Sequence, residues 1–235
     1  PESLAALREF LTQYDSDLRV VGYLRPPKAY AESVFQETIK RKRCELRGEL
    51  PIPTYRGIFG KFDDLFGREN VSIRKFDPGN FPGGCVVADF CAWLGIDGSA
   101  LAVRRENESL SLPAVQLLHF FRARSGRFAQ AERGIIDRLT TLDGRKVRFH
   151  SELAKTVVPK RPEDIAWAED RVGISLDEDW TAHDDMAVRD PAEVEIPGRE
   201  ALEWLGREAD VPTASLTGDE AGIFRALGGF MRSSG

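Results

Sequence analysis

The apolar run from Val20 to Leu24 limits most strongly what this chain can fold into. A short run of this kind is typical of a strand buried in a parallel sheet. Pro26 and Pro27 follow at once, and proline is well accepted in the first turn of a helix. We therefore expect a strand that leads directly into a helix ending near Lys42. Its buried stripe should comprise Ala31, Val34, Phe35, Thr38 and Ile39.

The remaining residues up to Gly95 continue this alternation of helix and strand. Residues 3–13 have an amphipathic helical pattern, and a second helix is expected from Tyr55 to Phe66. Val71 to Phe76 alternates like a strand. Cys85 to Leu94 has a helical pattern closed by Gly95. The order helix, strand, helix, helix, strand, helix predicts an α/β fold, with a partial parallel sheet flanked by helices.

Beyond residue 110 the pattern becomes entirely helical, which predicts a helical C-terminal part. Ser111 can cap a helix that has Pro113 near its start. After Ser175 acidic residues accumulate and the pattern weakens. We therefore divide the chain into a domain over 1–175 and an acidic tail over 176–235. Further helices are expected at 127–140, 161–172 and, within the tail, Arg199 to Ala209.

Composition narrows the class of protein. The chain has 235 residues, of which 42% are apolar and 30% charged, as in ordinary globular domains. The net charge of -5 argues against nucleic acid as the main partner. The longest apolar run, Cys85 to Ile96, is interrupted by Asp89, so we expect no membrane span. The opening residues have no signal-peptide pattern, and the absence of an initial Met suggests a fragment or a processed chain.

The cysteines and histidines suggest no metal site and no catalytic triad. Three cysteines are too few for a disulfide framework, so a reducing, cytoplasmic compartment is the default expectation. No histidine stands near them at ligand spacing. His119 is expected to pack within a helix, and His150 to lie in a loop or at the end of an element. His183 should form a solvated acidic loop with Asp184 and Asp185.

The residues with the clearest chemical implication are Arg25 and Ser33. Arg25 stands at the carboxyl end of the predicted strand, where ligands bind in open α/β sheets. Its planar guanidinium suits a phosphate, and the Ser33 hydroxyl, about two helical turns on, can add a donor. Two alternatives stay open. Arg25 could cap carbonyls or pair with a carboxylate, and Ser33 could be a solvated surface serine.

This segment resembles the 3'-phosphate motif of sulfotransferases, in which an Arg at a strand end, a Pro and a helical Ser follow one another. Tyr55 to Asp77 looks like the family's helix-and-strand block with its Phe-Gly and Glu-Asn-Val elements. Asp89 to Ile96 looks like its Asp-Phe and Leu-Gly-Ile block. Asn107 to Ser111 looks like the Asn-x-Ser-Leu-Ser motif of bacterial sulfotransferase-like proteins. Together the similarity covers about residues 3–175.

The resemblance implies a fold of the P-loop nucleoside-triphosphatase type and the co-substrate 3'-phosphoadenosine 5'-phosphosulfate. Arg25 and Ser33 would bind its 3'-phosphate. The sulfuryl group would pass to a hydroxyl or amine, with a carbohydrate or another small molecule as the expected acceptor.

Two departures from the family pattern affect the expected activity. No Gly-rich phosphate loop precedes residue 20, and no G-x-x-x-x-G-K-[ST] motif occurs in the chain. The family's catalytic base, a His or Glu, usually lies upstream of the Arg–Ser motif, so the catalytic residues are unassigned. We expect this chain to be inactive by itself. The alternatives are a non-catalytic binding or assembly domain on the same scaffold, or another nucleotide-dependent transferase.

Overall fold

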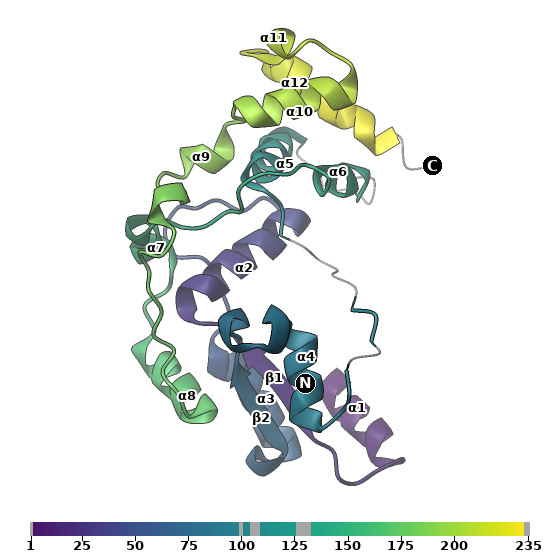
Figure 1. The fold of residues 1–235 in the computed structure, drawn as a ribbon, viewed down its shortest axis with the longest axis vertical. Coiled ribbons are helices and arrows are strands. Elements are labelled where there is room, and N and C mark those ends of the chain that lie inside the picture. Colours follow the sequence, from purple (N-terminus) through teal and green to yellow (C-terminus); the bar gives the residue numbers. More distant parts are fainter. Residues whose placement is uncertain (1, 99–100, 104–108, 126–132, 233–235) are drawn as a thin grey trace. The chain divides into compact units, whose positions relative to one another are not determined.

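A computed structural model describes residues 2–98, 101–103, 109–125 and 133–232 (Figure 1). The chain divides into two compact units, and each takes several separate stretches of the sequence. The first unit comprises Pro1–Tyr30, Pro51–Arg105 and Lys160–Glu178. The second comprises Ala31–Leu50, Glu106–Pro159 and Asp179–Gly235.

The first unit contains a two-stranded parallel sheet and the helices that flank it. Val20 is paired with Val71 and Leu24 with Lys75, which confirms the predicted parallel strands. The fold class is therefore α/β and mostly helical, as expected. The elements are α1 (Glu2–Thr12), β1 (Val20–Leu24), α3 (Tyr55–Phe66), β2 (Val71–Lys75), α4 (Val86–Leu94) and α8 (Pro162–Val172), with single 3-10 turns at Arg68–Asn70, Pro78–Asn80 and Pro82–Gly84.

One face of this small sheet forms the core of the first unit. Leu24, Val71 and Ile73 pack with Tyr55 of α3 and Ala168 of α8. Phenylalanines of α3 pack against the same cluster. Gly22 brings the backbone of β1 close to the ring of Phe59. A Cβ added at Gly22 would lie 2.7 Å from that ring. A residue without a side chain is needed there.

A buried ion pair ties α8 to α3 and β2. The Arg171 guanidinium donates to both carboxylate oxygens of Asp63, at 2.9 and 2.7 Å, and to the carbonyl oxygen of Val71 at 2.9 Å. Only 7% of the Arg171 side chain and 15% of the Asp63 side chain are exposed. Arg171 thus joins α8 to two elements that precede it by 100 residues or more in the sequence.

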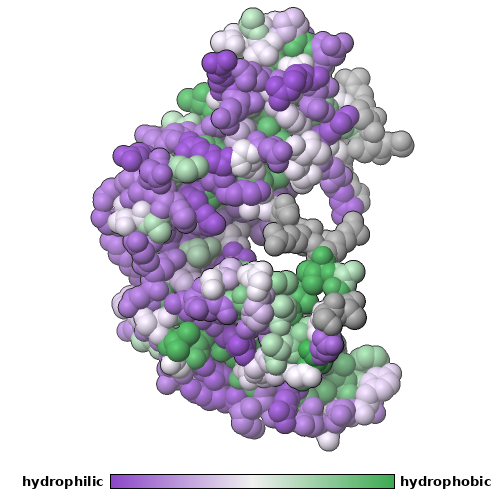
Figure 2. Space-filling model, in the orientation of Figure 1, coloured by the Kyte–Doolittle hydropathy of each residue, from purple (hydrophilic) through white to green (hydrophobic). Residues whose placement is uncertain are grey.

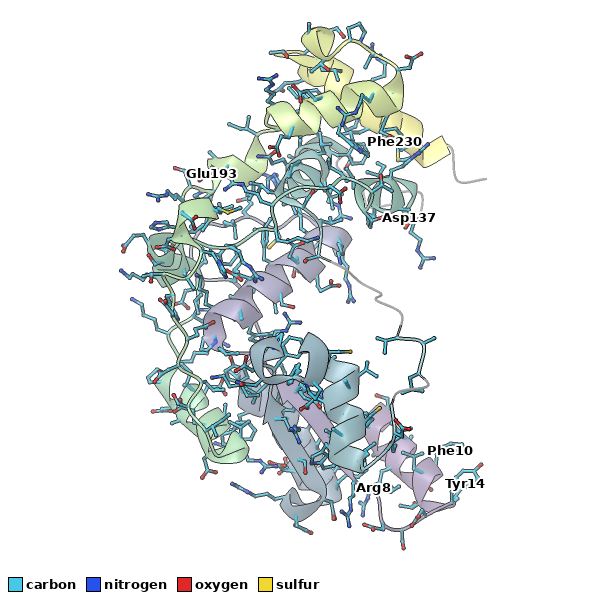
Figure 3. All side chains as sticks on the ribbon, viewed as in Figure 1. Arg8, Phe10, Tyr14, Asp137, Glu193 and Phe230 are labelled. Atoms are coloured by element: carbon cyan, nitrogen blue, oxygen red, sulfur yellow. The ribbon has the colours of Figure 1, made fainter. Side chains whose placement is uncertain are left out.

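The predicted helix over residues 3–13 is present as α1, but most of its apolar side is not buried. Leu7, Phe10 and Leu11, which helical spacing puts on one side of α1, are exposed. Figure 3 shows Phe10 projecting beside Tyr14, and their ring centroids are 5.3 Å apart. In Figure 2 apolar side chains also gather on the surface of the first unit around α4. Amphipathic spacing therefore predicted the helix but not its burial.

The second unit is helical. α2 (Pro27–Arg41) starts in the first unit and belongs to the second from Ala31 onward. The expected buried stripe of α2 is confirmed for Ala31, Phe35 and Ile39, whereas Val34 and Thr38 are only half-buried. The other elements are α5 (Leu112–Ser125), α6 (Arg133–Leu139), α7 (Ser151–Val157), α9 (Ala192–Glu195), α10 (Arg199–Ala209), α11 (Thr213–Leu216) and α12 (Glu220–Gly229), with 3-10 turns at Asp184–Met186 and Phe230–Arg232.

Helix α5 lies at the centre of this unit, and its residues from Leu112 to Arg122, apart from Gln116, are buried. Ser111 caps it as predicted, since its hydroxyl accepts from the Ala114 N–H at 3.3 Å and donates to the Leu142 carbonyl at 2.7 Å. Near the other end of α5, the buried Arg122 donates to the carbonyls of Ile39 and Lys40. Carbonyls in the last turn of a helix lack intrahelical donors, so Arg122 completes the C-terminus of α2.

Most predicted helices are confirmed, and α10 has the predicted bounds. Of the helix expected over 127–140, Arg133–Leu139 is present, and 127–132 lies outside the described residues. The division at residue 175 and the P-loop-type sulfotransferase architecture stay predictions. In the part of the chain that the structure describes, no helix is long and apolar enough to cross a membrane.

Candidate functional site

The predicted phosphate ligand Arg25 lies directly after β1, at the carboxyl edge of the sheet. Phe76, the residue after β2, donates its N–H to the Leu24 carbonyl at 2.6 Å, so the two strand ends stay together. The Arg25 guanidinium carbon lies 4.2 Å from the centre of the Phe76 ring. This cation–π contact restricts the side chain and holds its positive charge at the strand ends.

The backbone at Arg25 is fixed from α3. The Tyr55 hydroxyl donates to the Arg25 carbonyl at 2.6 Å, and the Tyr30 ring packs at 5.5 Å from the Tyr55 ring. Burial raises the pKa of Tyr55 well above its ordinary value, with a smaller contribution from Glu178. The phenol therefore stays protonated and keeps its role as a donor. The junction between β1 and α2 is thus held by side chains from another helix.

The first turn of α2 already holds an anionic group. The N–H groups of Lys28 and Ala29 donate to the two carboxylate oxygens of Glu178, at 2.5 and 3.2 Å. The start of a helix favours negative charge because its N–H groups lack intrahelical acceptors. Glu178 comes from the stretch after α8, 150 residues beyond Lys28. In this structure the chain itself supplies an anion to the turn that follows Arg25.

Ser33, the second predicted ligand, lies on α2 in the part that belongs to the second unit. It is half-buried. The nearby Gln36 is buried and exchanges hydrogen bonds with the backbone of Leu110, at 3.3 and 3.2 Å, and Glu32 accepts from the Phe149 N–H at 2.8 Å. The polar side of α2 is therefore packed in part rather than solvated throughout. Arg25 and Ser33 belong to different units, so their joint site stays a prediction.

A polar cluster that was not predicted lies on the other face of the sheet. Asp89 of α4 is buried and accepts from the Tyr23 hydroxyl at 2.6 Å and from Arg74 at 3.2 Å. Burial, followed by the hydrogen bond to Asp89, raises the pKa of Tyr23 to about 12. Tyr23 is therefore a donor at neutral pH and not a base. The sequence signal was present, since Asp89 interrupts an otherwise apolar run.

This cluster borders a pocket of about 370 Å³ in the first unit. Arg74, Lys75, Asp77 and Asn80 supply its polar lining. Lys75 already donates to two backbone carbonyls, and Asp77 accepts from Gly79 and Asn80. Arg74 and Asp89 form an ion pair. Arg74, Lys75 and Asp77 thus already have polar partners within the first unit.

The second unit brings a serine, a histidine and an aspartate together, but not as a catalytic triad. The Ser151 hydroxyl donates to Asp184 at 2.7 Å, and the Ser151 N–H donates to the other carboxylate oxygen at 2.8 Å. His150 Nε2 lies 3.3 Å from Asp184, and His150 Nδ1 accepts from the Glu152 N–H at 3.2 Å. In a triad the serine bonds to the histidine instead. These groups cap α7, and the expectation that Asp184 is solvated was wrong.

The remaining predicted positions have structural roles or are not described. His119 is 2% exposed, which confirms that it packs within its helix. Cys44 and Cys91 are buried thiols, and Cys85 is half-buried. Asn107 lies outside the described residues. Within the described part of the chain, no three metal-ligating side chains converge.

Comparison with known proteins gives no relative: no family model, no curated protein and no solved structure matches the chain.

Proposed function

We propose that this chain is part of a sulfotransferase and that its first unit helps to bind 3'-phosphoadenosine 5'-phosphosulfate. The observation that carries the proposal is the position of Arg25. Arg25 follows a parallel strand, and its guanidinium lies over the Phe76 ring. It precedes a helix whose first N–H groups donate to the Glu178 carboxylate. Ligands of open α/β sheets bind outside the carboxyl ends of the strands. A guanidinium beside a helix start is well suited to a phosphate.

In the proposed reaction, an acceptor hydroxyl or amine attacks the sulfur in line with the leaving phosphate oxygen. A bond from the acceptor to sulfur forms, and the bond from sulfur to the leaving oxygen breaks. Adenosine 3',5'-bisphosphate leaves, and the acceptor proton passes to a base. As in phosphoryl transfer, positioning and charge stabilisation provide most of the catalysis. Arg25 would act away from the sulfur, by fixing the 3'-phosphate. A carbohydrate is the proposed acceptor class.

Calorimetric titration with adenosine 3',5'-bisphosphate tests the assignment of Arg25. We expect Arg25→Ala to weaken binding at least about tenfold, because a charge-assisted hydrogen bond contributes more than about 1.4 kcal/mol. Arg68→Ala, which removes an exposed arginine of the same unit, is the matched control and should not change the affinity. Adenosine 5'-monophosphate lacks the 3'-phosphate and should bind equally to wild type and Arg25→Ala. Tight bisphosphate binding by Arg25→Ala would refute the assignment.

Ser33 is tested separately. Ser33→Ala should weaken bisphosphate binding several-fold and leave the monophosphate unaffected, because one neutral donor contributes about 1 kcal/mol. An unchanged affinity would remove Ser33 from the proposal without affecting Arg25.

A non-catalytic binding domain on the same scaffold is the second candidate. Transfer of radiolabelled sulfate from the co-substrate to a panel of carbohydrates separates the two. Bisphosphate binding that depends on Arg25, without transfer by the full protein, would support the binding domain. A preference for ATP over the bisphosphate would instead indicate another nucleotide-dependent transferase.

A further inference from the structure

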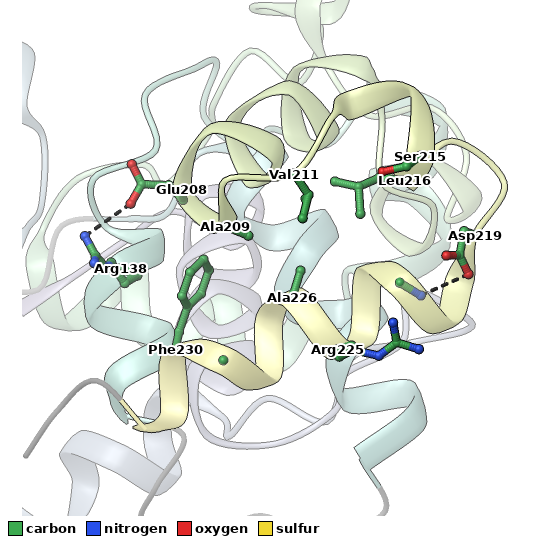
Figure 4. Close-up of a pocket in the computed structure, with 12 residues that line it drawn as sticks. Arg138, Glu208, Ala209, Val211, Ser215, Leu216, Asp219, Arg225, Ala226 and Phe230 are labelled. Atoms are coloured by element: carbon green, nitrogen blue, oxygen red, sulfur yellow. Dashed lines mark hydrogen bonds and ion pairs between the residues drawn. The ribbon is translucent and has the colours of Figure 1, made fainter.

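The second unit contains a pocket of about 560 Å³ among α6, α10, α11 and α12 (Figure 4). Its volume falls in the range of roughly 300 to 1,000 Å³ that small-molecule sites occupy. It shares no residue with the proposed nucleotide site, so a ligand of this pocket is independent of the proposed function.

Small residues of α12 line part of the pocket. Gly222, Ala226 and Gly229 line it, at helical spacings of four and three residues. Residues at these spacings share one face of a helix. A Cβ added at Gly229 would meet no atom within 4 Å, so the space beside it is open.

Apolar side chains form another part of the pocket wall. Val211, Leu216 and Phe230 line the pocket, and Leu216 and Phe230 are 3% and 5% exposed. The Trp204 ring packs edge-on against Phe230 with the ring centres 5.9 Å apart. The wall is therefore apolar and supported from behind, which suits the hydrocarbon part of a ligand.

Each end of the pocket has an arginine and a carboxylate, and the two ends differ in whether these groups pair with each other. At one end Arg138 pairs with Glu208 at 3.1 Å, so their charges compensate each other. At the other end Figure 4 shows Asp219 and Arg225. Asp219 caps α12 by accepting from the Gly222 N–H at 2.9 Å through Oδ1. Among the residues with described positions, none donates to its Oδ2, and Arg225 has no carboxylate partner.

We propose that this pocket binds a small zwitterion with an apolar body, of which an apolar amino acid is the simplest. Its carboxylate would pair with Arg225 and its ammonium with Asp219 Oδ2. Its side chain would lie between Ala226 and the wall of Leu216 and Phe230. A simple anion would also meet the charge of Asp219, and a simple cation that of Arg225. Only a ligand with both charges matches this end of the pocket.

Titration of the ¹⁵N-labelled protein with L-phenylalanine, followed by amide chemical shifts, tests the proposal. 3-Phenylpropanoate lacks the ammonium, and 2-phenylethylamine lacks the carboxylate. We expect phenylalanine to shift amides of α10, α11 and α12. Each single-charge probe should bind at least about tenfold more weakly, because each lacks one charge-assisted contact. The absence of shifts there with phenylalanine, or equally tight binding of 3-phenylpropanoate, would overturn the proposal.

Two glycine variants and one arginine variant locate the binding. Gly229→Leu should fill the pocket and abolish the shifts. Gly228→Leu is the matched control, because a Cβ there meets only the flexible end of Met231, at 3.8 Å, and does not line the pocket. Arg225→Ala removes an exposed side chain, so it should fold normally and lose at least about tenfold in affinity. Unchanged binding by either Gly229→Leu or Arg225→Ala would refute the site.

Discussion

Removing Asp63 should destabilise the first unit strongly, because the Arg171 guanidinium would stay buried without its counter-ion. Breaking a buried ion pair from one side typically costs about 3 to 5 kcal/mol. In this structure Asp63 accepts two hydrogen bonds from Arg171, and a third goes to the Val71 carbonyl. Since that third bond survives in Asp63→Ala, we expect the lower end of the range, about 3 kcal/mol.

A double-variant cycle isolates the energy of this pair. The cycle consists of Asp63→Ala, Arg171→Met and the double variant, in which both charges are replaced by apolar groups, and such replacements are often close to neutral. The double variant should therefore be more stable than Asp63→Ala by about 2 kcal/mol or more. An exposed pair serves as the control. Arg199→Ala removes one partner of the Arg199–Glu203 pair and should not change stability measurably.

Native-state hydrogen exchange is the appropriate assay, because it gives an opening free energy for each region of a chain with two units. Protection of the β1 and β2 amides should fall in Asp63→Ala and largely recover in the double variant. Two results would show that the pair does not hold α8 to the sheet. One is a fall of less than about 1 kcal/mol in the opening free energy of Asp63→Ala, and the other is additive effects of the Asp63 and Arg171 substitutions.

Three further outcomes are expected. Burial lowers the pKa of His119 below its ordinary 6.5, so the unfolded chain binds the proton more tightly than the folded chain does. Stability should therefore fall as the pH drops through about 6.5. In thermal unfolding, His119→Gln should lose less stability over this pH range than the wild type. Gly22→Ala should lower the free energy of unfolding in urea by about 1 to 3 kcal/mol, because the added Cβ clashes with Phe59. Adding Phe59→Leu to this variant should restore part of the lost stability. Tyr55→Phe should lose about 1 kcal/mol and weaken bisphosphate binding, since the Arg25 carbonyl loses its donor.

The elements that the sequence predicted best are those whose pattern is local. Val20–Leu24 is a short apolar run stopped by prolines, and its bounds are correct. The predicted bounds of α3 and α10 are also correct. α7, α9, α11 and α12 were not predicted. α12 contains three glycines, and its apolar residues alone do not form a strong periodic pattern.

The site was predicted only where it depends on adjacent residues. The position of Arg25 at a strand end follows from the order of strand and helix. Glu178 at the first turn of α2 could not be predicted, since nothing local links two residues 150 positions apart. The same holds for Asp184, which reaches Ser151 across 33 residues. Contacts of this kind depend on tertiary packing, which no short pattern encodes.

The first unit is built from stretches that lie far apart in the sequence, and this has a consequence for folding. Its sheet comes from residues before Phe76, but the helix and loop that cover one face of that sheet end at Leu176. During synthesis the two strands and α3 therefore emerge long before α8, and the part of the apolar face that α8 covers is still exposed. Closing such long loops slows folding, and the exposed face favours association with other chains. We infer that production of this protein depends on chaperone supply and low temperature more than its size alone would suggest.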